Sequence, residues 1–369
     1  MRRIAISAAT TTLSVSLVGC GGLDAVSSSD DASPAKGDDI TVGLLLPERS
    51  NPQYEQFHYP VIKAKVASLT HGQGRVAYAN ADANPGEQSR QLQQMINAQV
   101  DVILLDPVDA HAIAGGVKKA KKAGIAVIAY DRLAEGPIDG YITFDNELVG
   151  EIQGRSLLEA LGEDAGVSDK IVMMNGSPTD PNAQQFKAGA LLALDRNVTI
   201  AKSFDTVDWK PQTAEKNMTE AIKEIGKNNI KGVYAANDGL AGGVIEALKA
   251  AGVTDLPPIT GQDAELSAVQ RIVAGEQYMS AYKPYPQEAE LAAEMAVAKA
   301  QSKGLQFDAL TRDEVDSPTH KGIPSHFVPV VALTKNNIKD MVIRDGMYTP
   351  SDICVPRLAT ECAAAGLTK

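Results

Sequence analysis

The chain has 369 residues and a formal net charge of −11 at pH 7, from 35 basic and 46 acidic residues. This acidic balance argues against a nucleic-acid partner, because nucleic-acid-binding proteins present a basic surface. A hydrophobic content of 44% and a charged content of 22% are typical of a globular protein, and the length allows one or two domains with sizeable cores.

The first residues have the features of a bacterial export signal. Arg2 and Arg3 precede residues 4–18, an apolar or small-residue stretch that is too short to span a bilayer. Residues 17–20 read LVGC and are similar to the bacterial lipobox, whose cysteine is acylated after cleavage. We therefore expect a lipoprotein signal peptide at residues 1–19 and a lipid anchor on Cys20, which would hold the protein at the outer face of the cytoplasmic membrane. Residues 20–39, rich in Ser, Asp, Gly and Ala, are predicted to form a flexible tether.

From residue 40 onward, short apolar segments alternate with amphipathic segments. Asn84 and Pro85, for example, are an N-cap residue and a proline at the first position of a predicted helix. The predicted strands are residues 40–46, 102–105, 125–130, 171–174, 198–204, 232–236, 259–261, 278–282 and 328–333. This alternation indicates parallel sheets with right-handed crossovers. So many strands favour two doubly wound domains; a single closed barrel is the alternative, and the apolar strands do not decide between them.

Two cysteines remain near the end of the sequence, Cys354 and Cys362. In an exported protein a close pair of cysteines usually forms a disulfide. A metal site is the alternative, but it lacks nearby His or further Cys ligands. We therefore predict a Cys354–Cys362 disulfide, and we expect no metal and no other cofactor.

Polar and charged side chains follow several of the predicted strands. Ligands of open α/β sheets bind beyond the carboxyl ends of the strands, so these side chains are candidate ligand contacts. Their donors and acceptors match the hydroxyl groups of a small sugar, and an indole can cover its apolar face. The candidates are Asp131, Arg132, Asn182, Trp209, Asn237, Asp263 and Lys283.

The alternative for each candidate is a surface ion pair, a turn or a helix cap. We expect Asp238, for instance, to be only a helix N-cap. Core packing is the common fate of a tryptophan. The polar neighbours Asp208 and Lys210 nevertheless favour a sugar platform for Trp209.

Six blocks of sequence resemble the D-xylose-binding proteins of bacterial ABC importers, and they occur in the same order. They read AYDRL (129–133), ITFDNE (142–147), GSPTDPNA (176–183), ANDGLAGG (236–243), TGQDAEL (260–266) and AYKP (281–284). The likeness covers residues 40 to about 343. It implies the type I periplasmic-binding-protein fold, in which two doubly wound parallel-sheet domains are joined by a three-strand hinge and hold sugar between them.

The resemblance also implies limits for the two lobes. The N-terminal sugar-binding lobe would be residues 40–143 plus 284–325, and the C-terminal lobe would be residues 144–283 plus 326–369. The hinge crossings would fall near residues 144–145, 282–283 and 326–327.

By match to the family pattern, all seven candidates would contact sugar. The first loop departs from this pattern, because Gln53 stands where an arginine is expected before an aromatic residue, here Tyr54. We include both as ligand-binding candidates, and Arg49 is a candidate for the missing cation. The departure concerns the identity of the sugar more than the function.

The expected function is that of a non-enzymatic solute-binding lipoprotein. It would be a monomer that binds D-xylose or a similar monosaccharide, closes around it and delivers it to a membrane permease. A sugar-responsive transcription factor shares the core fold but needs a DNA-binding headpiece where the signal peptide stands. A secreted glycosidase would need two flanking carboxylates, for which Asp131 and Asp263 are candidates. The sequence does not separate an importer component from a sugar sensor or chemoreceptor.

Overall fold

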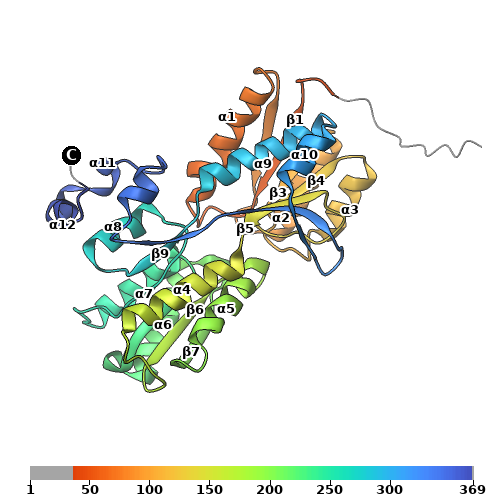
Figure 1. Cartoon of the computed structure of the whole chain (residues 1–369). Helices are drawn as coiled ribbons and strands as arrows, with labels where there is room; N and C mark the ends of the chain where they lie inside the picture. The colour runs from red at the N-terminus through yellow and green to blue at the C-terminus, as the bar shows by residue number, and fades with distance from the viewer. Residues whose placement is uncertain (1–35, 368–369) are drawn as a thin grey trace, which may run out of the picture. The chain divides into compact units, whose positions relative to one another are not determined.

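The computed structural model describes residues 36–367, which contain two parallel β-sheets flanked by helices (Figure 1). The predicted signal peptide, Cys20 and most of the predicted tether lie outside these residues. Within the described part of the chain, no helix combines the length and the apolar character that crossing a bilayer requires.

The first lobe is built on a seven-stranded sheet with the order β10-β11-β5-β4-β3-β1-β2, in which only β10 and β11 pair antiparallel. Its strands are β1 (Thr41–Leu46), β2 (Arg75–Asn80), β3 (Val102–Leu105), β4 (Ala126–Tyr130), β5 (Gly140–Phe144), β10 (Asp313–Val315) and β11 (Ile323–Val328). Its helices are η1 (Tyr54–His58), α1 (Tyr59–Leu69), α2 (Pro85–Asn97), α3 (Ala114–Lys122), α9 (Tyr285–Ala300) and α10 (Gly304–Leu310).

Both faces of this sheet are buried, which explains its nearly continuous apolar strands. In β3, Val102 and Leu104 belong to a core shared with α1 and α9. The alternate residues Ile103 and Leu105 belong to a second core shared with α2 and α3.

The second lobe is built on the parallel sheet β7-β6-β8. Its elements are α4 (Asn146–Leu161), β6 (Lys170–Asn175), α5 (Pro181–Leu194), β7 (Thr199–Asp205), η2 (Val207–Trp209), α6 (Pro211–Ile225), η3 (Lys227–Asn229), β8 (Ile230–Ala235), α7 (Asp238–Ala250) and α8 (Leu266–Ala274). Helices α4 and α5 pack so closely that glycine is required at the contact: a Cβ at Gly150 would lie 1.9 Å from the carbonyl oxygen of Phe186.

The chain passes three times between the two sheet systems: after β5, after β9 (Met279–Tyr282), and between β11 and β12 (Val331–Thr334). Strands β9 and β12 pair antiparallel, and an isolated bridge between Gln262 and Ala281 links the segment before α8 to β9. These crossings give the two-lobed, doubly wound architecture that was predicted. The residue limits of the lobes stay a prediction.

Two predicted strands differ from those observed. Residues 259–261 form no continuous strand and contribute only an isolated bridge from Ile259 to Val233. The single strand predicted at residues 328–333 is instead the end of β11 and the start of β12, which belong to different sheets. Pro329 lies between them, and a proline has no N–H to continue a ladder.

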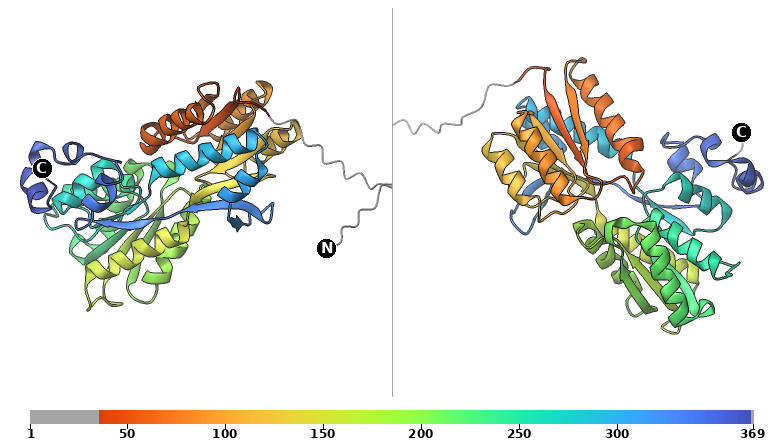
Figure 2. Two further views of the ribbon diagram at one scale, coloured as in Figure 1. Left: turned by 45° about the horizontal axis from the view of Figure 1, so that its top comes forward. Right: turned by 180° about the vertical axis from the view of Figure 1, so that it is seen from behind.

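The C-terminal tail packs beside α8, as both views in Figure 2 show. It consists of η4 (Lys339–Ile343), α11 (Pro350–Ile353), η5 (Pro356–Leu358) and α12 (Ala359–Ala364). Cys354 and Cys362 form the predicted disulfide, with their Cα atoms 5.9 Å apart.

Candidate ligand-binding site

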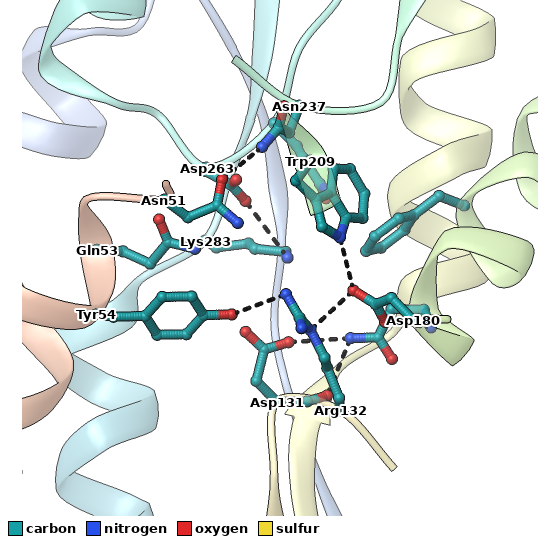
Figure 3. Close-up of a pocket in the computed structure, with 13 residues that line it drawn as sticks. Asn51, Gln53, Tyr54, Asp131, Arg132, Asp180, Trp209, Asn237, Asp263 and Lys283 are labelled. Atoms are coloured by element: carbon teal, nitrogen blue, oxygen red, sulfur yellow. Dashed lines mark hydrogen bonds and ion pairs between the residues drawn. The ribbon is translucent and has the colours of Figure 1, made fainter. Parts of the chain in front are cut away.

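A cavity of about 260 Å³ lies where the two lobes meet (Figure 3). The nine residues predicted from the sequence all line it: Gln53, Tyr54, Asp131, Arg132, Asn182, Trp209, Asn237, Asp263 and Lys283. Four further residues complete the lining: Asn51, Asp180, Phe186 and Gln262.

The carboxyl ends of strands carry several of these side chains, as expected for an open α/β sheet. Asp131 and Arg132 follow β4 directly, Asn237 lies two residues beyond β8, and Lys283 follows β9. The backbone of Asp131 is left-handed, with φ 57°, and its N–H donates to the carbonyl oxygen of Ile142. Such strain in a residue with a Cβ often marks a functional position.

Arg132 is the centre of a network of buried charges. Its Nη1 and Nη2 donate to the two carboxylate oxygens of Glu48 at 3.1 and 2.7 Å. Its Nε lies 2.8 Å from Oδ2 of Asp180 and 3.6 Å from Oδ1 of Asp106. Burial acts to lower the pKa of Arg132, but the carboxylates of Asp180 and Glu48 raise it well above its usual value, so the guanidinium stays charged.

Polar contacts link the two lobes directly across the cavity. Nδ2 of Asn182, in the first turn of α5, donates to Oδ1 of Asp131 at 3.0 Å. Nδ2 of Asn237 donates to Oδ1 of Asn51 at 3.0 Å. Burial raises the pKa of Asp131, which Lys283 and Arg132 oppose.

Lys283 and Asp263 form the second charged pair of the cavity, with Nζ 3.5 Å from Oδ1. Oη of Tyr285 donates to the same oxygen of Asp263 at 2.5 Å. Nζ of Lys283 also lies 5.1 Å from the ring centres of both Phe144 and Phe186. Burial acts to lower the pKa of Lys283, but Asp263 and Asp131 carry it above its usual value, so this cation also persists.

Trp209 both lines the cavity and packs in the core of the second lobe, with only 3% of its surface exposed. Its Nε1 donates to Oδ2 of Asp180 at 3.1 Å, and its ring lies edge-on to Phe186 at 6.3 Å. The far edge of the indole rests on Gly176, where a Cβ would lie 2.0 Å from Cη2. The two interpretations offered from the sequence, core packing and platform, are therefore compatible.

Three amide oxygens at this site are buried and have no hydrogen-bond partner among the described residues. They are Oε1 of Gln53, Oδ1 of Asn182 and Oε1 of Gln262. A buried polar atom is normally hydrogen-bonded, so these acceptors are available to a ligand that donates hydrogen bonds. Together with the charged pairs, they suit a small, uncharged molecule rich in hydroxyl groups.

Sequence reasoning missed Glu48, Asn51, Asp180 and Gln262. The strand-end rule that identified Asp131 applies to Glu48 as well, because β1 ends two residues before it. Asp180 is the N-cap of α5. Nothing in the sequence around it indicates that it pairs with Arg132.

The prediction for Asp238 was wrong. The N-cap of α7 is Asn237, whose side chain accepts from the N–H of Leu240, and Asp238 is the first helical residue. Among residues 36–367, no group of His, Cys, Asp and Glu side chains is arranged to hold a metal ion.

Comparison with known proteins relates this chain to periplasmic binding proteins. Residues 42–304 match the family model described as periplasmic binding protein domain. The chain is 37% identical over 325 residues to the D-xylose-binding periplasmic protein of Escherichia coli (strain K12), covering 86% of this chain and 94% of that protein. It is 33% identical to the protein of the same name from Haemophilus influenzae, covering 87% and 94% of the two chains.

Among solved structures, an ABC transporter solute-binding protein from Clostridium phytofermentans with bound β-D-glucose is similar to this chain. The two superpose with a TM-score of 0.74 at 26% sequence identity, covering 85% of this chain and 99% of the other. This similarity confirms the predicted fold.

Proposed function

The chain belongs to the periplasmic binding protein family, and from this premise we propose that it binds D-xylose or a similar monosaccharide between its lobes and delivers it to an ABC permease. The family consists of solute-binding proteins rather than enzymes, which sets the glycosidase alternative aside. The relatives named for D-xylose binding and the structure with bound glucose support a monosaccharide as the solute.

The observation that carries this proposal is the chemistry of the cavity. Buried carboxylates, cations and unpartnered amide oxygens from both lobes face one small space. A sugar hydroxyl can donate a hydrogen bond and accept another, so sugar hydroxyls can donate to the carboxylates and amide oxygens and accept from the cations. A ligand that contacts both lobes binds the closed form more strongly than the open form, and it shifts the protein toward closure by that difference in affinity.

We assign direct sugar contacts first to the side chains whose polar atoms are available in the cavity. Gln53, Asn182 and Gln262 offer acceptors, while Lys283 and Asp263 offer a charged donor and acceptor. Trp209 supplies the apolar plane, with Tyr54 as a second aromatic ring on the opposite lobe (Figure 3). Asp131, Arg132 and Asn237 stay predicted contacts as well.

A thermal-shift screen of pentoses and hexoses, followed by calorimetry of the best sugar, tests the proposal. We expect D-xylose to raise the melting temperature and to bind with a Kd on the order of micromolar, about −8 kcal/mol. Stabilisation by no monosaccharide, with a correctly folded protein, would contradict it.

We also propose that the protein is exported and anchored through a lipid on Cys20, on the basis of the LVGC sequence at residues 17–20. Cys20→Ala should then move the protein from the membrane fraction to the soluble fraction or the culture medium. A wild-type protein that already fractionates as soluble would refute the anchor without affecting the sugar-binding proposal.

A further inference from the structure

Glu48 occupies a special position at the cavity. It follows β1 and is only 3% exposed. It is not one of the described residues that line the cavity. Its carboxylate instead contacts two residues that do, Arg132 and Asn51. A ligand in the cavity would therefore meet these two side chains and not Glu48.

The carboxylate of Glu48 holds Arg132 in a two-pronged pairing. Oε2 accepts from Nη1 at 3.1 Å and Oε1 accepts from Nη2 at 2.7 Å, an arrangement that fixes the orientation of the guanidinium as well as its position. The backbone oxygen of Glu48 accepts from Nδ2 of Asn80 at 3.0 Å, which anchors the residue to the end of β2.

The other donors of Arg132 are also engaged by the protein. Nη1 donates to the carbonyl oxygen of Pro107 and Nη2 to Oη of Tyr54, both at 3.3 Å. With the two bonds to Glu48, these use all four N–H groups of Nη1 and Nη2. The fifth donor, Nε, lies 2.8 Å from Asp180, which belongs to the second lobe. In this arrangement Arg132 connects one lobe to the other.

Asn51 repeats this pattern. Its Nδ2 donates to Oε1 of Glu48 at 2.7 Å, and its Oδ1 accepts from Nδ2 of Asn237 at 3.0 Å. Asn237 caps α7 in the second lobe, so its amide is itself held in place. Both side chains that Glu48 orients, Arg132 and Asn51, therefore contact residues of the opposite lobe.

We propose that Glu48 is a positioning residue that presets Arg132 and Asn51 for their contacts with Asp180 and Asn237, so that one carboxylate organises two polar bridges between the lobes. Contacts between lobes that exist only in the closed form lower its free energy relative to the open form. Glu48 then raises sugar affinity without touching sugar, and Arg132 contributes mainly through its bridge to Asp180. This inference rests on the proposed function, in which closure accompanies sugar binding.

Glu48→Gln tests the proposal, because it removes the charge and keeps the size of the side chain. We expect sugar affinity, measured by calorimetry with D-xylose, to fall about tenfold or more, the scale set by bonds to a charged group. Stopped-flow measurements should assign most of this loss to faster dissociation. The matched control is Glu87→Gln, which breaks a carboxylate–arginine pair with Arg90 on the exposed side of α2 and should leave affinity unchanged.

A second measurement reports closure directly and separates positioning from a purely structural role. Spin labels on Lys63→Cys in α1 and Lys216→Cys in α6, two exposed sites on opposite lobes, report the distance between the lobes. We expect Glu48→Gln to reduce the fraction of molecules at the short, closed-form distance, both without sugar and at a D-xylose concentration near the wild-type Kd, while its far-UV spectrum is unchanged. If Glu48→Gln does not fold, Asn51→Ser removes one bridge and should still reduce the fraction of molecules at the closed-form distance relative to the wild type.

Unchanged affinity together with an unchanged distance in Glu48→Gln would overturn the inference, as would an unchanged distance in Asn51→Ser if only that variant folds. A wild-type protein that binds no sugar would refute the proposed function instead. In that case the distance measurement still decides whether Glu48 controls the bridges.

Discussion

This protein has two buried clusters of charged groups, and residues that are neighbours in the sequence belong to different clusters. Asn237 and Asp263 line the cavity, whereas Asp238, next to the first, and Glu265, two residues beyond the second, belong to a cluster around Arg271. The two clusters contain the same kinds of side chain. They differ in where the partners of those side chains come from.

In the second cluster the partners are supplied by the same lobe. Asp238 accepts from Nε2 of Gln277 at 2.7 Å, from Oγ of Ser280 at 2.8 Å and from the N–H of Glu265 at 3.0 Å. Nη2 of Arg271 donates to the carbonyl oxygen of Asp238 at 2.7 Å. This cluster ties α7, α8 and β9 together and leaves the Asp238 carboxylate with no need of a ligand.

In the cavity, by contrast, several partners come from the opposite lobe, and amide oxygens of Gln53, Asn182 and Gln262 find no partner among the described residues. The difference teaches that buried charge alone does not identify a binding site. The cavity is distinguished by polar groups of both lobes that face one space. An unpartnered buried atom alone does not identify it, because Oε1 of Glu265 in the second cluster also has no partner among the described residues. The following predictions test this distinction in order of expected effect.

The largest effect is expected at the indole of the cavity. Trp209→Ala should reduce sugar affinity by roughly 30- to 1,000-fold, because truncating a central tryptophan costs about 2–4 kcal/mol in a binding site. Gly176→Ala should weaken binding too, since the added Cβ would collide with the ring. Calorimetry with D-xylose measures both, and far-UV circular dichroism verifies folding. Full affinity in a folded Trp209→Ala variant would assign the indole to core packing alone.

The comparison itself is tested by one substitution in each cluster. Asp263→Ala should cost roughly 1.5–3 kcal/mol of sugar binding, the range for hydrogen bonds to a charged group. Asp238→Ala should leave sugar affinity within about twofold and instead lower the free energy of unfolding by about 1–3 kcal/mol, because Gln277 and Ser280 lose their acceptor. Calorimetry and urea denaturation separate the two outcomes. Equal losses of affinity in both variants would erase the distinction between the clusters.

The tail gives the next effect, because it packs on α8, the helix that carries Arg271. Tyr348 lies beside Glu265 and Asp238, and burial is the main cause that raises its pKa. Replacing both Cys354 and Cys362 by Ser should lower the free energy of unfolding by about 2–3 kcal/mol, as expected for a short closed loop, and leave sugar affinity unchanged. Thiol labelling of the unreduced, denatured protein should first find neither cysteine free. A labelled Cys354 or Cys362 would contradict the disulfide.

The last effect concerns pH. Burial, with the nearby Asp238, raises the pKa of Glu265 to about 8, whereas in the unfolded chain it is about 4.3. Between these values the folded protein keeps a proton that the unfolded chain releases, so the free energy of unfolding should fall as pH rises from about 5 to 8. Glu265→Gln cannot titrate and should make this fall less steep, measured by urea denaturation across the range. The same change at the exposed Glu220 is the control, and equal slopes in both variants would contradict the prediction.

Much of the fold followed from local patterns. The strand at residues 102–105, the N-cap at Asn84 and the disulfide between Cys354 and Cys362 are as predicted. The patterns failed where tertiary context decides, as at the division of residues 323–334 between β11 and β12, whose two parts pair in different sheets. A run of apolar residues indicates burial but does not name the sheet that buries it.

The sequence by itself placed seven candidate side chains after predicted strands, and the family resemblance added Gln53 and Tyr54. All nine line one cavity. It did not determine which of two neighbours, Asn237 or Asp238, faces that cavity. Asn237 has an extended backbone and Asp238 begins α7, so their side chains leave the chain in different directions that only packing fixes. Nor did it reveal Glu48 as the partner of Arg132, 84 residues away, or Asn51 as the partner of Asn237, 186 residues away. A polar side chain acquires its role from the groups it meets when the chain is folded, and only the tertiary structure brings those groups within hydrogen-bond distance.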